Sequence, residues 1–218
     1  MTFEDAWKYS STIRGWYTQS EACQLWDAAV LAKSLFPDGM FVEVGAYCGR
    51  STSLLAQIEP ANFLVIEPFI LAPNNGNDVP ATNGRYVHSE QSRETLHEFL
   101  RTMAPVPSVT LFEGKTLDWW GESKAGKFPL GHAYHIAPIS LLHIDGDHTD
   151  GVFQDIACLL PLVKAGGYVV FHDFTFKHTH YSRVSEAVRP AVPMYGLDQV
   201  SIIDSAILFC KTAAEGKC

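Results

Sequence analysis

Acidic and histidine side chains gather at two points of the sequence, each directly after a short apolar run. Residues 142–148 read Leu-His-Ile-Asp-Gly-Asp-His, and residues 169–173 read Val-Val-Phe-His-Asp. If the two runs are neighbouring parallel strands, they lie ~4.8 Å apart and their polar ends meet at one edge of the sheet. The side chains brought together in this way are Asp145, Asp147, His148, His172 and Asp173.

Carboxylates packed this closely repel each other, which raises the pKa of at least one of them unless a cation intervenes. A divalent ion would relieve the repulsion. Asp and His ligands with water favour magnesium or manganese, or iron or zinc if a histidine coordinates. A structural interpretation also stands: Asp147 or His148 caps a helix that begins near Asp150, and His172 is a buried histidine bonded to the backbone.

A glycine-containing turn between a strand and a helix occupies residues 41–52. Gly45 would let the backbone turn tightly off the strand, and Gly49 would permit close contact between helix and strand. The start of the helix offers free N–H groups to a ligand carboxylate, to which Ser51 adds a hydroxyl. Glu43 could accept a hydrogen bond from a ligand ammonium. A ligand with both groups has an amino-acid part, like the methionine end of S-adenosylmethionine (SAM), although such a turn can also simply pack a strand against a helix.

Two further positions bear on the ligand. Tyr47 stands where the dinucleotide pattern G-x-G-x-x-G needs its second glycine, so its bulk would obstruct a pyrophosphate and disfavours an NAD-dependent oxidoreductase. Glu67 ends the second apolar run, where a carboxylate can bind both hydroxyls of a ribose; a helix cap or a solvated loop residue is the alternative. Thr116, after the third run, could line an adenine.

The segment from Val42 to Ser51 resembles the first motif of class I SAM-dependent methyltransferases, in particular that of catechol O-methyltransferase and related small O-methyltransferases. The Asp-Gly-Asp-His sequence at 145–148 and the pairs Gly15-Trp16 and Glu21-Ala22 are similar to small bacterial members. The resemblance extends from residue 40 to about residue 173.

The resemblance implies roles for single residues at the cofactor and the metal. Tyr47 would lie near the transferable methyl, Glu67 would bind the ribose, and Asp145 would contact the cofactor. Metal-dependent members have one ligand after the fourth strand and an adjacent pair after the fifth, which gives Asp145, His172 and Asp173. The departure is His172, where those enzymes have an acid, and it weakens the case for magnesium.

The base of these enzymes follows two or three residues after the first metal ligand, so Asp147 or His148 would take the proton of the acceptor. We therefore predict a SAM-dependent methyltransferase that acts on an oxygen of a small-molecule acceptor, with Mg²⁺ or another divalent cation as a second cofactor. The alternatives are a metal-independent N- or C-methyltransferase and a SAM-binding protein without catalysis. No segment of the sequence identifies the acceptor.

The elements that must position these residues alternate between short apolar runs and helical patterns. The predicted strands are 40–44, 63–66, 109–112, 139–144, 168–171, 199–203 and 206–210, and the predicted helices are 20–35, 51–58, 92–103, 150–163 and 182–192. This alternation predicts a Rossmann-like α/β fold with a mainly parallel seven-stranded sheet and helices on both faces. The last two strands should form a C-terminal antiparallel hairpin.

The chain is predicted to form one domain, in which residues 1–36 are an N-terminal helical extension packed on a SAM-binding domain of residues 37–218. The net charge of −8 argues against nucleic acid as the partner, and no apolar run approaches the ~20 residues of a membrane span. Five widely spaced cysteines fit the cytoplasm. Exposed aromatic residues near the N-terminus would suit a homodimer. Residues 73–80 are predicted as a loop that could act as a lid. Residues 178–181 are predicted either as acceptor contacts or as a solvated loop.

Overall fold

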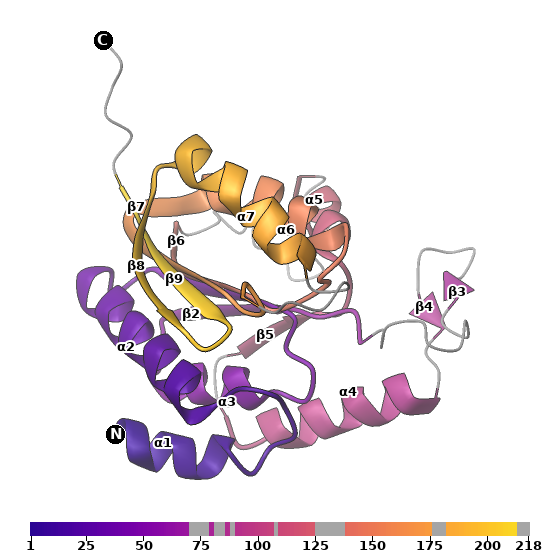
Figure 1. The fold of residues 1–218 in the computed structure, drawn as a ribbon. Helices are drawn as coiled ribbons and strands as arrows, with labels where there is room; N and C mark the ends of the chain where they lie inside the picture. Colours follow the sequence, from indigo (N-terminus) through magenta and orange to yellow (C-terminus); the bar gives the residue numbers. More distant parts are fainter. Residues whose placement is uncertain are drawn as a thin grey trace.

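Seven strands form a single sheet in the computed structural model, which describes residues 1–69, 79–80, 86–87, 90–106, 109–124, 138–175 and 182–212. Their order across the sheet is β5-β2-β1-β6-β7-β9-β8 (Figure 1). The strands are β1 (Met40–Val44), β2 (Asn62–Ile66), β5 (Val109–Phe112), β6 (Ile139–Ile144), β7 (Val163–Phe171), β8 (Leu197–Ile203) and β9 (Ala206–Lys211). Strand β9 runs antiparallel to both of its neighbours, β7 and β8, and the other neighbouring pairs of this sheet are parallel, so the predicted parallel sheet with a C-terminal hairpin is confirmed.

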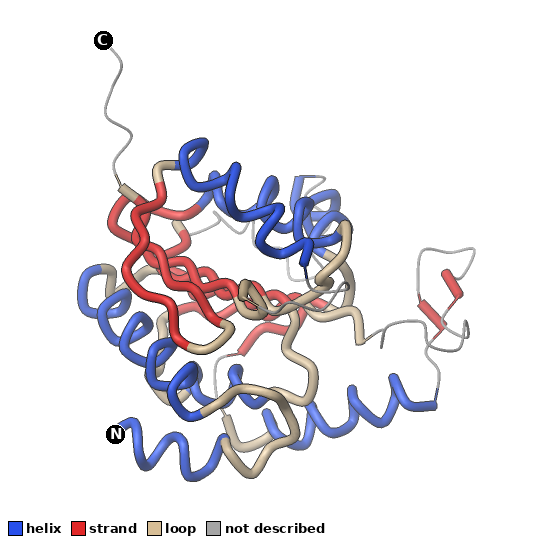
Figure 2. Tube along the Cα trace, viewed as in Figure 1, coloured by secondary structure: helices blue, strands red, loops and turns tan. Residues whose placement is uncertain are grey.

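Helices cover both faces of the sheet (Figure 2). One layer contains α1 (Phe3–Ser10), α2 (Gln19–Leu35), α3 (Arg50–Ala56) and α4 (Glu90–Met103). The other layer contains α5 (Thr116–Lys124), α6 (Gly151–Leu159) with a 3₁₀ turn at Leu160–Leu162, and α7 (Ser182–Tyr195). A separate two-stranded ribbon pairs β3 (Val79–Pro80) with β4 (Tyr86–Val87). The described part of the chain has no helix that is both long and apolar enough to span a bilayer.

The central strands are buried on both faces, which is why their sequences read as continuous apolar runs. Alternate residues point to opposite layers. Val42 and Ile144 pack in the core under α6 and α7, whereas Phe41 and Leu141 pack in the core under α2 and α3. The polar side chain of His143 shares the side of Leu141, and this places it beneath the N-terminal helices.

The structure differs from the prediction at several boundaries. Helices α1 and α5 were not predicted. The predicted helix 150–163 ends at Leu159, and β7 begins at Val163 rather than at Tyr168, because a register irregularity opposite β6 absorbs the glycines at 166–167. The predicted lid lies outside the described residues except for Val79 and Pro80, and residues 178–181 lie outside them entirely.

A capping box fixes the start of α2. The Thr18 hydroxyl accepts a hydrogen bond from the backbone N–H of Glu21 (3.2 Å), while the Glu21 carboxylate accepts one from the backbone N–H of Thr18 (2.9 Å). The sequence prediction began this helix at Ser20 and missed the Thr-x-x-Glu pattern two residues earlier. Helix α2 packs against β6 to β9, so the N-terminal helices belong to the core; a boundary at residue 36 stays a prediction.

The cap leads to a prediction for stability. Thr18→Ala removes the capping oxygen and a hydrogen bond from the Thr18 hydroxyl to Asp204 (2.8 Å), so we expect a loss of about 1 kcal/mol in the free energy of unfolding. Urea denaturation measures it. The control is Thr12→Ala, which removes an exposed hydroxyl bonded to the Tyr9 carbonyl (2.7 Å) and leaves the N-cap of α2 intact. Equal losses in the two variants would contradict the role of the cap.

Candidate functional site

The strand order reverses between β1 and β6, because β1 continues to β2 on one side while β6 continues to β7 on the other. These four strands run parallel, and their carboxyl ends lie at one edge of the sheet (Figure 1). In open α/β sheets, ligands bind in the crevice outside the strands at such a reversal. The predicted site residues follow these strand ends.

The turns after β1 and β6 are in direct contact. Gly45 has a φ of +85°, and a Cβ built on it would lie 2.3 Å from the backbone carbonyl oxygen of Asp145. The backbone N–H of Asp145 donates to the Val44 carbonyl (2.8 Å). A side chain at position 45 would therefore push the two turns apart, and only glycine satisfies both the backbone conformation and the space.

The helix that follows the first turn begins at Gly49, whose φ of +91° again favours glycine. A Cβ there would lie 3.2 Å from side-chain atoms of Phe99 and Met103, so the glycine also allows α4 to approach. Ser51 lies buried in the first turn of α3. These positions agree with the predicted turn, and their contacts with a cofactor stay predictions.

Glu67 organises the same turn. One carboxylate oxygen accepts hydrogen bonds from the backbone N–H groups of Ala46 (2.8 Å) and Tyr47 (2.9 Å), and the other accepts from Phe69 (2.6 Å). Burial raises the pKa of Glu67 against these bonds. To bind a ribose as predicted, Glu67 would have to exchange part of these backbone contacts for ligand hydroxyls.

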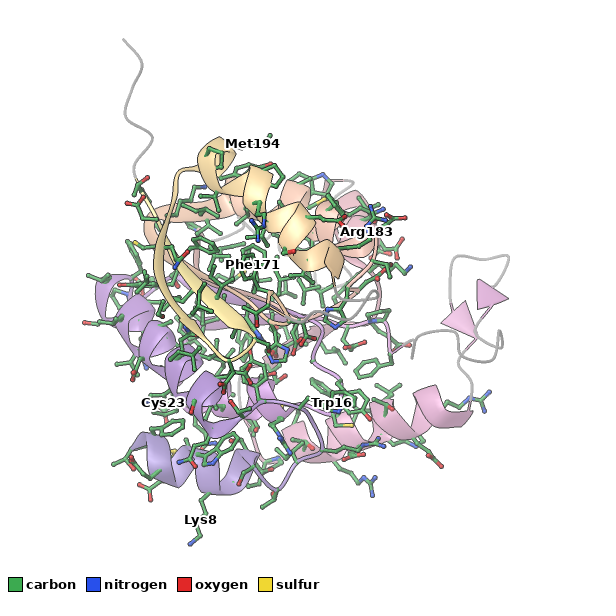
Figure 3. The ribbon with its side chains drawn as sticks, viewed as in Figure 1. Lys8, Trp16, Cys23, Phe171, Arg183 and Met194 are labelled. Carbon is green, nitrogen blue, oxygen red and sulfur yellow. The ribbon has the colours of Figure 1, made fainter. Side chains whose placement is uncertain are left out.

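Tyr47 connects the turn to the N-terminal segment. Its ring packs on Trp16 with centroids 4.8 Å apart, and the Arg14 guanidinium lies 5.0 Å from the Tyr47 centroid. Trp16 is 75% exposed and lies between the strand edge and α4 (Figure 3). Arg50 holds this segment in place by donating to the carbonyls of Ile13 (2.6 Å) and Tyr17 (3.2 Å).

Two predicted cofactor contacts are not supported by the placement of their side chains. Glu43 is fully buried, and its carboxylate accepts hydrogen bonds from the Thr52 hydroxyl and pairs with His143 (2.9 Å), so it is turned away from a ligand ammonium. Thr116 is the first residue of α5, and its buried side chain lies beside Asp155 of α6 rather than facing an adenine. Neighbouring elements hold both side chains in the interior: α3 and β6 in the case of Glu43, and α6 in the case of Thr116.

The acid and histidine cluster does form at the ends of β6 and β7. Ligand atoms of Asp145, His148 and Asp173 lie within 4.8 Å of one another. The His148 Nε2 atom is 3.3 Å from an Asp173 carboxylate oxygen, and both side chains are partly exposed. Asp173 has a φ of +56°, a conformation that non-glycine residues adopt mainly where the surrounding structure enforces it. These three side chains could share a cation or a proton.

His172 is not part of this group, in contrast to the predicted ligand set. Its Nδ1 lies 2.9 Å from Asp145, and its Nε2 faces Ser205 (3.3 Å) and Glu21 (3.5 Å). Burial alone would lower the pKa of His172, but the charge of Asp145 and hydrogen bonds to the surrounding carboxylates raise it to about 12. Both ring nitrogens of His172 therefore face protein oxygens, whereas His148 lies beside Asp145 and Asp173; a ligand role for His172 stays a prediction.

Asp147 has a local structural role. Its Oδ1 accepts hydrogen bonds from the backbone N–H (2.8 Å) and the hydroxyl (2.5 Å) of Thr149, in the turn that leads into α6. Burial raises the pKa of Asp147, and the bonds from Thr149 outweigh this and lower it. Of the two predicted bases, His148 is therefore the one that faces the other acids of the cluster.

The comparison with protein families identifies the domain that carries these residues. Residues 42–174 match the family model described as a methyltransferase domain, and this match covers well over half of the chain. The matched segment contains the turn after β1 and both parts of the acid and histidine cluster. The chain belongs to this methyltransferase family.

Solved structures agree in fold at low sequence identity. The O-methyltransferase TomG from Streptomyces achromogenes, in complex with SAM, has a TM-score of 0.60 and 15% identity over 97% of this chain and 89% of its own. A structure described as a caffeoyl-CoA O-methyltransferase from Staphylococcus aureus has a TM-score of 0.61 and 12% sequence identity, over 98% of this chain and 93% of its own. An O-methyltransferase from Bacillus cereus in complex with SAH has a TM-score of 0.57 and 12% sequence identity, over 96% of this chain and 90% of its own. No curated protein sequence matches the chain significantly.

Asp155, the neighbour of Thr116, gives a prediction for pH dependence. Burial raises its pKa from 3.8 to about 7, so the folded state retains a proton that the unfolded state releases. The contribution of Asp155 to the free energy of unfolding is therefore complete below pH 3.8, and it is lost as the pH rises towards 7. Asp155→Asn should therefore stabilise the protein by about 2 kcal/mol more at pH 8 than at pH 5.

Thermal denaturation of the wild type and of Asp155→Asn at the two pH values measures this difference. Glu122→Gln is the matched control, because Glu122 is an exposed carboxyl on the neighbouring helix α5. A stability difference for Asp155→Asn that does not change with pH would contradict the buried, protonated state of Asp155.

Proposed function

We propose that the chain uses SAM as its methyl donor and transfers the methyl group to a hydroxyl oxygen of a small-molecule acceptor. The observation that carries the proposal is the Asp145, His148 and Asp173 cluster, which lies next to the β1 turn of a methyltransferase domain. Structural neighbours that are O-methyltransferases in complex with SAM or SAH support the choice of donor and of oxygen.

The donor would bind at the β1 turn. Gly45, Gly49 and Ser51 would accommodate its amino-acid end at the start of α3, and Glu67 would take the ribose. Tyr47 and Asp145 would flank the methyl group, since Gly45 brings the turns that carry them into contact. Trp16 extends this surface from the N-terminal segment.

Methyl transfer needs an acceptor oxygen that loses its proton, because the sulfonium methyl is already electrophilic. The oxygen attacks the methyl carbon, the C–O bond forms as the C–S bond breaks, and SAH is released. His148 would take the acceptor proton, and the Asp173 carboxylate, 3.3 Å away, would stabilise the imidazolium that forms. Asp145 would orient the acceptor on the other side.

The same three side chains fit a divalent cation, since they offer two carboxylates and one imidazole within coordinating reach of each other. This mixed donor set suits manganese, iron or zinc better than magnesium, which prefers oxygen ligands alone. A bound cation would lower the pKa of the acceptor hydroxyl. In that case His148 holds the cation and is not the base.

We further propose that the acceptor is not a nucleic acid, because the net charge of −8 opposes phosphate binding, and that the protein acts in the cytoplasm, off the membrane. Exposed Trp16, Leu31 and Leu35 suit a homodimer interface. Size-exclusion chromatography with light scattering tests the dimer.

Calorimetric titration with SAM tests the donor, with and without prior EDTA treatment. We expect micromolar binding, and its absence under both conditions would overturn the proposal. Release of SAH with a panel of phenols and sugars then tests the acceptor. Turnover that survives EDTA excludes the cation and leaves His148 as the base, whereas turnover that is lost and then restored by Mn²⁺ assigns the cation.

His148→Gln tests the role of the histidine directly. We expect kcat to fall about 10²- to 10⁴-fold because a positioned base or ligand is lost. The dissociation constant for SAM should change less than about threefold. His97→Gln, an exposed histidine on α4, is the control and should retain full turnover. A His148→Gln variant as active as this control would remove His148 from the mechanism.

A further inference from the structure

A line of buried polar side chains runs from the N-terminal segment into the sheet, directly below the candidate site. The Tyr17 hydroxyl lies 2.6 Å from His143 Nε2, and His143 Nδ1 lies 2.9 Å from a Glu43 oxygen. The Thr52 hydroxyl donates to the other Glu43 oxygen. All four side chains are buried, and the proposed reaction uses none of them.

A line of buried polar side chains adds little to the stability of the fold. Polar groups removed from water gain little over well-packed apolar side chains of the same size, even when every hydrogen bond is made. Satisfied buried networks do, however, hold their members in one arrangement. The Tyr17 hydroxyl is kept protonated by burial and by the nearby carboxylates, which raise its pKa well above 10, so it can donate to His143.

Tyr17 also touches the site itself. Its ring stacks on the imidazole of His172, with centroids 4.4 Å apart and planes 18° apart. His172 in turn holds the carboxylate of Asp145 at 2.9 Å. Glu43 and His143 are partners in the register of β1 and β6, and Gly45 and Asp145 follow two residues later on the same strands. Tyr17 therefore joins the buried line to the wall of the site.

We propose that Tyr17 is a positioning residue for methyl transfer. Its hydroxyl fixes the ring on His143, the ring fixes the plane of His172, and His172 fixes Asp145. The functional part of this inference rests on the proposed methyltransferase activity, because Asp145 matters only if the reaction occurs beside it. It also makes the N-terminal segment a part of the catalytic architecture.

Two variants separate the hydroxyl from the ring. Tyr17→Phe keeps the stack on His172 and loses the bond to His143, whereas Tyr17→Leu loses both. The control is Tyr9→Phe, which removes a hydroxyl bond of the N-terminal segment to the Thr102 carbonyl (3.2 Å) on α4. Nitrogen-detected NMR of the histidine rings reports each contact without any substrate.

We expect Tyr17→Phe to move the ring signals of His143 and leave those of His172 in place, and Tyr17→Leu to move both. With the acceptor found in the panel, Tyr17→Leu should lower kcat about 10-fold or more while the SAM dissociation constant stays within about threefold. Tyr17→Phe should recover most of that loss but remain about 2- to 5-fold below the wild type, and Tyr9→Phe should match the wild type.

The proposal would be overturned if Tyr17→Leu changed neither the ring signals of His172 nor kcat. If Tyr17→Leu does not fold, a Tyr17→Phe variant equal to Tyr9→Phe in both His143 signals and kcat would overturn it as well. A wild type that binds no SAM contradicts the proposed function instead, and the ring signals then still decide whether Tyr17 positions His172.

Discussion

The pair formed by buried His172 and partly exposed Asp145, joined at 2.9 Å, connects the ends of β6 and β7 and fixes the geometry around them. Because the imidazolium is held by Asp145, by Glu21 and by stacking on Tyr17, it neutralises acids that would otherwise repel one another. These contacts hold the imidazole ring of His172 in one orientation. Asp173 and His148, which like Asp145 are partly exposed, complete the site.

The alternation of side chains along β1 and β6 separates structure from chemistry. Within each strand the apolar residues fill two cores, and Glu43 and His143 are drawn into the interior beneath the N-terminal helices. Beyond the strand ends this alternation stops, and the turns that carry Gly45 and Asp145 come into direct contact. The reactive groups therefore depend on a rigid sheet and on one position where only glycine fits.

The N-terminal extension contributes more than coverage of one face. Its capping box places Glu21 against His172 and Ser205, the loop before it places Tyr17 on the same imidazole, and Trp16 rests on Tyr47. A segment remote in sequence from the methyltransferase motifs thus touches both halves of the site.

The sequence alone determined the Rossmann-like sheet, the turn after β1 and the meeting of the acids at two strand ends, because apolar periodicity and glycine positions reflect local backbone constraints. Tertiary structure alone decided which side chains of that cluster face outward. His172 and His148 have the same chemistry in sequence, yet only packing against Tyr17 and Glu21 makes His172 a buried cation and leaves His148 with Asp173. Glu43 and Thr116 likewise have buried side chains beside residues of other elements, and orientation of that kind depends on residues far away in the chain.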